Sequence, residues 1–152
     1  MFTIYLPAVG DGVASSRQLN SFPANTEGSE LILLVDDEKP LRNVLCTILE
    51  TKGYRVLEAE DARSAMQILD TQTAPVDLLV TDIVMPGMSG PALAKQLNRT
   101  RNLKRAVFIS GYSENFLEPE LDGFPESIVL QKPFSAEAFL KSVRMLLERK
   151  LQ

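Results

Sequence analysis

Five short apolar segments, separated by stretches with helical spacing, constrain this chain more than any other feature. The segments are LILLV (31–35), RVLEA (55–59), VDLLVTD (76–82), AVFIS (106–110) and SIVLQ (127–131). Largely apolar runs of this length are typical of strands that are buried on both faces of a parallel sheet. Their alternation with helices predicts an α/β fold: a doubly wound, five-stranded parallel sheet with right-handed crossovers and helices on both faces.

The segments between these strands carry helix signals. In the first of them, Pro40 suits an opening turn and Gly53 provides a stop. The apolar stripe expected between them is Leu41, Val44, Leu45, Ile48 and Leu49. Asp61 and Ser135 are placed to cap later helices. The segment 113–125 holds two prolines and a glycine, so we expect its helix to be short or irregular.

The amino end of the chain differs from the rest. Residues 8–29 are rich in glycine, serine, alanine and asparagine and show no sustained periodicity, which favours a linker. We therefore expect residues 1–29 to be a linker outside the fold, without order of their own. Residues 30–150 are then one domain, which is the default for a chain of 152 residues.

Composition narrows the classes of function. The formal charge of −4 and the pI near 4.9 argue against a surface for nucleic acid or for an anionic membrane. No apolar run approaches the roughly 20 residues of a membrane helix. The single cysteine, Cys46, fits a small core residue and a reducing compartment, so we expect a cytoplasmic location. Because the chain contains no histidine, any histidine chemistry must come from a partner.

Charged residues follow three of the expected strands. Asp36 and Asp37 come directly after the first apolar run, Asp82 ends the third, and Lys132 follows the fifth. The carboxyl ends of parallel strands meet at one edge of the sheet, where such folds bind ligands. Carboxylates bind Mg²⁺ and an ammonium group offsets phosphate charge, so this convergence predicts phosphorylation of an aspartate.

Each of these residues also has a plain structural interpretation. The acids at 36–38 could cap the first helix, and Asp82 could be a turn residue. Lys132 could be solvated, and Ser110 could be an ordinary loop hydroxyl. Their joint placement at strand ends favours a shared site over four independent coincidences.

Four motifs in order carry a family resemblance. They are LVDDE (34–38), TDIVMPGMSG (81–90), SGY (110–112) and KPF (132–134). With these motifs, the chain from about 30 to 149 resembles the receiver domain of bacterial two-component response regulators. The resemblance implies a flavodoxin-like sheet with strand order 2-1-3-4-5.

The resemblance also implies roles at the acidic site. Asp82 would be the phosphoacceptor. Asp37 and Asp82 would bind Mg²⁺ directly, Asp36 would act through water, and the backbone carbonyl of Val84 would complete the set. Mn²⁺ could take the place of Mg²⁺.

Further implied roles concern the strands beyond the phosphoacceptor. Lys132 would pair with the phosphoryl group and would be aimed by a cis peptide bond to Pro133, while Ser110 would hydrogen-bond a phosphate oxygen. Receivers usually carry an aromatic switch residue three positions before the lysine, but Val129 stands there in this chain. Whether Tyr112 replaces it is open.

Partners and alternatives follow from the same resemblance. MFTIYLPAV (1–9) resembles the final strand of the ATP-binding domain of sensor histidine kinases, so we expect the receiver of a hybrid kinase. The expected partners are a histidine kinase dimerisation domain, in cis or in trans, and a histidine phosphotransfer domain, with no nucleic acid and no direct membrane contact. A weak homodimer stays open. The alternatives are a free-standing receiver and a hydrolase of the haloacid dehalogenase type, which would need an acid at position 84.

Overall fold

The computed structural model describes residues 28–111, 124 and 126–148. Within this part of the chain, five strands and four helices follow one another. They are β1 (Leu31–Val35), α2 (Lys39–Thr51), β2 (Arg55–Ala59), α3 (Ala62–Asp70), β3 (Leu78–Asp82), α4 (Gly90–Arg101), β4 (Arg105–Ser110), β5 (Glu126–Gln131) and α6 (Ala136–Glu148). The helix expected within 113–125 and the residue Tyr112 lie outside the described residues, as does the segment 1–27.

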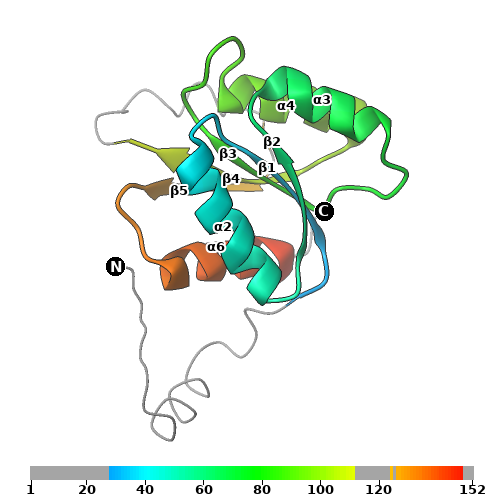
Figure 1. Ribbon diagram of the computed structural model, residues 1–152. Coiled ribbons are helices and arrows are strands. Elements are labelled where there is room, and N and C mark those ends of the chain that lie inside the picture. The colour runs from blue at the N-terminus through cyan, green and yellow to red at the C-terminus, as the bar shows by residue number, and fades with distance from the viewer. Residues whose placement is uncertain (1–27, 112–123, 125, 149–152) are drawn as a thin grey trace, which may run out of the picture.

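The sheet is parallel throughout and has the order β2-β1-β3-β4-β5. Helices α2 and α6 cover one face and α3 and α4 cover the other, as Figure 1 shows. The predicted fold class is therefore confirmed. The register pairs Val35 of β1 with Thr81 of β3 and with Ala59 of β2, so these strands end at nearly the same level.

The sheet divides the core into two layers. Side chains of β1 alternate between them: Leu33 and Val35 face α3 and α4, whereas Ile32 and Leu34 face α2 and α6. Every residue of β1 and β3 is buried, which explains why these central strands read as nearly unbroken apolar runs. Burial on both faces leaves solvent access to these strands mainly at their ends.

Most helix signals are confirmed. The Asp61 carboxylate accepts a hydrogen bond from the Ser64 amide at 2.8 Å, and the Ser135 hydroxyl oxygen accepts one from the Ala138 amide at 3.0 Å. Cys46 is buried, as expected of a small core residue. The prediction for Val44 is wrong, because its side chain is 48% exposed. The buried residues of α2 are Leu45, Cys46 and Leu49, which places Val44 on the outer side of that helix.

The third strand is shorter than expected. It begins at Leu78 and not at Val76. Asp77 is the reason: its backbone amide donates to the Leu31 carbonyl at 2.8 Å and its carboxylate accepts from the Leu31 amide at 2.9 Å. The aspartate thus closes the amino end of the β1–β3 pair, where a further strand residue would otherwise continue.

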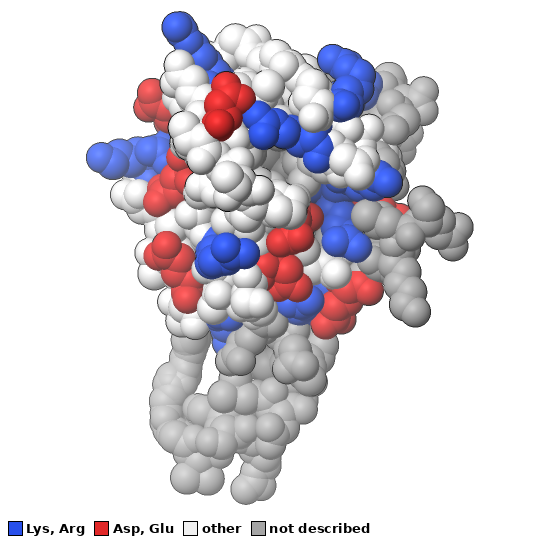
Figure 2. All heavy atoms as spheres, turned by 90° about the vertical axis from the view of Figure 1, so that its right-hand side faces the viewer, with Lys and Arg blue, Asp and Glu red and all other residues white. Residues whose placement is uncertain are grey.

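An ion-pair network lies at the amino edge of the sheet. Arg144 of α6 donates to both carboxylate oxygens of Glu30, at 3.3 and 3.0 Å, and to the Tyr54 hydroxyl at 3.1 Å. Gly28 packs against this network, and its amide donates to the Lys52 carbonyl at 3.0 Å. A Cβ on Gly28 would come within 2.6 Å of the Arg144 guanidinium. Figure 2 views this side of the molecule and shows acidic and basic side chains intermixed across it.

No helix in the described part of the chain is both long enough and apolar enough to cross a bilayer.

Candidate metal and phosphoacceptor site

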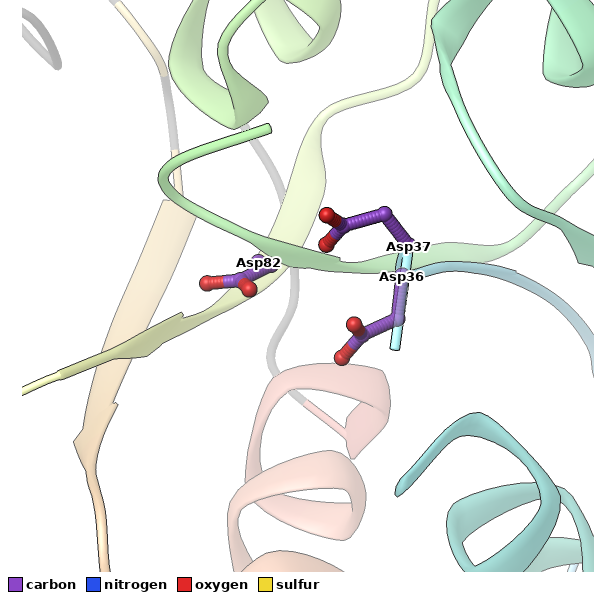
Figure 3. A group of neighbouring side chains, drawn as sticks. All are labelled: Asp36, Asp37 and Asp82. Carbon is purple, nitrogen blue, oxygen red and sulfur yellow. The ribbon is translucent and has the colours of Figure 1, made fainter. Parts of the chain in front are cut away.

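Three carboxylates meet at the carboxyl edge of the sheet. Asp36 and Asp37 follow β1 directly, and Asp82 is the last residue of β3. One carboxylate oxygen from each lies within 4.8 Å of the others. Figure 3 shows the three side chains gathered where the two strands end. This spacing is compact enough for all three to share one cation, directly or through a bound water.

Asp36 is held in place through one of its carboxylate oxygens, and the other oxygen has no hydrogen-bond partner. It is fully buried, its amide donates to the Ala59 carbonyl at 3.1 Å, and its Oδ1 accepts from the Glu38 amide at 2.8 Å. Its Oδ2 is also buried and has no hydrogen-bond partner. A buried acceptor without a partner is costly, so this oxygen is suited to a cation or to a bound water.

The alternative interpretation, in which these acids cap α2, finds little support in the structure. The residue at the cap position is Glu38, and its side chain makes no capping hydrogen bond. The Asp36 carboxylate bonds an amide that precedes the helix. The acids are therefore arranged around the strand ends and not around the helix start.

Burial and neighbouring negative charge raise the pKa of Asp82 and of Asp36. Burial raises the pKa of Asp82 to about 6, and the nearby charge of Asp36 adds to that effect. Burial likewise raises the pKa of Asp36 above its usual value. Both shifts mean that the clustered negative charge is unfavourable in the folded chain. A hard divalent cation would offset this charge, so the donor set fits Mg²⁺ or Mn²⁺.

Lys132 lies at the same edge but is paired with an unexpected residue. Its Nζ donates to Glu38 Oε1 at 3.0 Å. Burial lowers the pKa of Lys132, but the Glu38 hydrogen bond and the charge of Asp82 outweigh this and raise it overall. The peptide bond between Lys132 and Pro133 is cis, as the resemblance implied. Nothing in the sequence indicates that Glu38 holds the lysine.

The remaining predicted residues lie around this cluster. Ser110 ends β4 and is buried, and its hydroxyl donates to the Gly111 carbonyl at 2.7 Å. The Lys132 amide donates to the Ser110 carbonyl at 2.9 Å, which ties the ends of β4 and β5 together. Val84 follows β3 and its side chain is 58% exposed. Val129 is 42% exposed on β5.

Gly90 is a supporting residue whose importance the sequence did not reveal. Its amide donates to the Ile83 carbonyl at 2.9 Å, and a Cβ at this position would lie 2.2 Å from the Asp82 carbonyl oxygen. The backbone of α4 can thus approach the end of β3 only because residue 90 has no side chain. The first turn of α4 therefore helps to fix the backbone of Asp82.

Fold and site together define an α/β domain with a cation-ready acidic cluster and a lysine at the carboxyl edge of its sheet. Over residues 32–144 the sequence matches the response regulator receiver domain family. The chain belongs to that family.

Similar proteins and solved structures support the same family assignment. CpdR, a response regulator receiver protein of Brucella abortus, is 34% identical over 76% of this chain and 95% of its own length. The sensor kinase CckA of the same organism is 32% identical over 97% of this chain, which spans 16% of that kinase. A response regulator receiver protein from Sinorhizobium medicae superposes with a TM-score of 0.67 at 31% identity, covering 78% of this chain and 94% of that one.

Proposed function

We propose that this receiver accepts a phosphoryl group on Asp82 in a two-component phosphorelay, with Mg²⁺ as the required cation. The observation that carries the proposal is the cluster of Asp36, Asp37 and Asp82 with a lysine at the same sheet edge. A hydrolase of the haloacid dehalogenase type is not favoured, because position 84 is an exposed valine and offers no acid.

The chemistry is transfer of a phosphoryl group from nitrogen to oxygen. A carboxylate oxygen of Asp82 attacks phosphorus, the bond from phosphorus to the donor imidazole breaks, and the imidazole leaves with that electron pair and takes up a proton. The product is an acyl phosphate. Bound Mg²⁺ would offset negative charge on the phosphoryl oxygens.

The residues around Asp82 would each take a part. Asp37 and Asp82 would bind the cation directly, Asp36 through water, and Val84 through its backbone carbonyl. Lys132 would leave Glu38 and pair with the phosphoryl group. That exchange replaces one ion pair by another, so it need not cost much free energy.

Ser110 would serve as the link to conformation. Its hydroxyl would exchange the Gly111 carbonyl for a phosphate oxygen. Because the Ser110 carbonyl already bonds the Lys132 amide, movement at either residue would reach both strand ends. Phosphorylation would in this way change the surface presented to partners.

The donor must be another domain, because the chain has no histidine. The exposed Val44 on the outer side of α2 offers an apolar contact for such a partner. We propose the dimerisation domain of a sensor histidine kinase as the donor and a histidine phosphotransfer domain as a further partner, in the cytoplasm. Residues 1–29 would be a linker and residues 30–150 the receiver.

Two parent architectures have support. The similarity to CckA extends over 97% of this chain, which favours a receiver within a hybrid kinase. The similarity to CpdR covers 95% of that protein, which favours a free-standing receiver. The chemistry at Asp82 is the same in both.

The test is a mass measurement after incubation with acetyl phosphate and Mg²⁺. We expect one added phosphoryl group that hydroxylamine removes, and none when EDTA replaces Mg²⁺. Asp82→Asn should abolish the addition. Asp70→Asn, at an exposed aspartate of α3, is the matched control and should react normally. Undiminished addition in Asp82→Asn, or in EDTA, would contradict the proposal.

A further inference from the structure

Arg42 connects the metal-site loop to a neighbouring strand. From α2, its Nη1 donates to the backbone carbonyl of Asp36 at 2.6 Å. Its Nε lies 3.4 Å from Glu58 Oε1 on β2, an ion-pair distance without hydrogen-bond geometry. The side chain is only 13% exposed. The guanidinium therefore lies between β2 and the loop that carries two of the three clustered carboxylates.

The position of Asp37 depends on this loop. Its side chain is exposed and makes no hydrogen bond to the described part of the chain. The Asp36 carbonyl and the Asp37 amide belong to one rigid peptide plane. A hydrogen bond that fixes the Asp36 carbonyl therefore also fixes the direction in which the chain enters Asp37.

Charge alone would make Arg42 an unfavourable neighbour of a cation site. A guanidinium repels a bound divalent cation by Coulomb's law. It is also poorly placed in the first turn of α2, where the helix dipole favours acids. A planar, multiply donating side chain can compensate for both if its geometry holds the loop.

We propose that Arg42 is a positioning residue for the cation site, which it organises through the Asp36 carbonyl while Glu58 anchors its guanidinium. The inference rests on the proposed function, because it assumes that the cluster binds Mg²⁺. Residues that orient the ligands of a metal typically change its affinity about 10- to 100-fold when they are replaced. If Arg42 acted only through its charge, replacing it by a neutral residue would raise the Mg²⁺ affinity. If Arg42 anchors the loop, the same replacement would lower that affinity.

The experiment is a titration of the full chain with Mg²⁺ alone, followed by amide chemical shifts in NMR. We expect Arg42→Met, which keeps an apolar stem, to weaken Mg²⁺ affinity about 10-fold. Arg42→Lys keeps the charge without the planar fork and should also weaken binding. If the guanidinium acted only as a charge, Arg42→Met would bind Mg²⁺ more tightly, and that result would overturn the inference.

Arg101 provides the matched control. It too donates to a backbone carbonyl, that of Leu69 at 3.2 Å, and to a carboxylate, that of Asp70 at 2.7 Å, but it joins α4 to α3. Arg101→Met should leave Mg²⁺ affinity unchanged. An equal weakening in Arg101→Met and Arg42→Met would show a general loss of structure and overturn the inference.

A milder variant covers the case in which Arg42→Met does not fold. Glu58→Gln leaves Arg42 in place and removes the charge that anchors it, so we expect a weakening of about 2- to 5-fold. Unchanged affinity in both Glu58→Gln and Arg42→Lys would overturn the inference and leave the proposed function intact. If the wild-type chain did not bind Mg²⁺, both would be wrong.

Discussion

The pKa values of buried and half-buried carboxylates are shifted in opposite directions at the two edges of the sheet. At the amino edge, the arginine of α6 bonds both oxygens of Glu30. Burial alone would raise the pKa of Glu30, but the hydrogen bonds from Arg144 and from backbone amides, together with the charge of Arg144, outweigh it and hold that pKa below its usual value. At the carboxyl edge, the pKa of Asp36 and of Asp82 is raised. The ionised form of Glu30 thus stabilises the fold at the amino edge, whereas the ionised forms of Asp36 and Asp82 are unfavourable at the carboxyl edge.

This difference shows where the fold can support a function. Three acids in a small space destabilise the folded chain unless something positive joins them. Lys132 does not do so fully, because its ammonium bonds Glu38. We propose that the remaining charge of the cluster binds a cation and a phosphoryl group, whereas the network at the opposite edge stabilises the domain. The following predictions test this difference between the two edges.

The largest effect on stability is expected from Arg144→Met at the amino edge. The variant removes the guanidinium that donates to the half-buried Glu30 and to the hydroxyl of the buried Tyr54, so the free energy of unfolding should fall by about 2–3 kcal/mol. Urea unfolding at pH 7 measures this. Arg101→Met, which breaks a more exposed pair with Asp70, is the control and should lose less than about 1 kcal/mol. Equal losses would remove the stabilising role assigned to the amino edge.

The opposite sign is expected from Asp82→Asn at the carboxyl edge. Asparagine is nearly isosteric and carries no charge, so it relieves the repulsion from Asp36. The pKa of Asp82 rises from 3.8 to about 6 in the folded chain. We therefore expect the variant to gain about 1–3 kcal/mol in free energy of unfolding at pH 7.5 in EDTA. A loss of stability in urea unfolding would mean that the cluster is not strained.

The same shift predicts a pH dependence. The folded pKa of Asp82 lies above the unfolded one, so the folded chain takes up a proton first as the pH falls through 6. Without Mg²⁺, stability should therefore rise by about 1–2 kcal/mol between pH 7 and pH 5. Asp82→Asn should lose most of this rise and keep the smaller part due to Asp36. Identical pH profiles for the two proteins would contradict the pKa shift.

At lower pH the amino edge should dominate. The folded pKa of Glu30 is lowered, so its contribution is present above the unfolded pKa and is lost as the pH falls through the folded pKa. The free energy of unfolding should thus pass through a maximum as the pH falls from 7. Protonation of Asp82 and Asp36 at the carboxyl edge should cause the rise from neutral pH, and protonation of Glu30 at the amino edge should cause part of the fall at acid pH.

Much of the fold could be predicted because the signals are local. Buried central strands leave apolar runs, and residues at their ends are brought together by the parallel topology alone. The position of Asp82 beside Asp36 needed no more than this. The prediction for Val44 is wrong because helical spacing identifies the apolar face of a helix but not how wide its buried part is. In α2, Leu45, Cys46 and Leu49 are buried, and Val44 lies outside that face.

The contacts that the sequence did not reveal join residues far apart in the chain. Glu38 and Lys132 are 94 residues apart, and nothing in either neighbourhood specifies the other. Arg42 gave a faint signal, since a cation in the first turn of a helix is unfavourable and suggests a tertiary partner. Only the packing of α2 against β2 identifies that partner as Glu58.

The smallest effect is expected from Glu38→Gln. Lys132 must leave Glu38 to reach a phosphoryl group, and a partly exposed ion pair is worth about 0.2–1 kcal/mol, so removing it should speed phosphorylation of Asp82 about 2- to 5-fold. The initial rate with acetyl phosphate at saturating Mg²⁺ measures this, because saturation removes any effect of Glu38 on cation affinity. Glu60→Gln, at an exposed acid after β2 on the same edge, controls for net charge. If both variants were equally faster, the gain would come from net charge, and the Glu38 contact would not restrain the lysine.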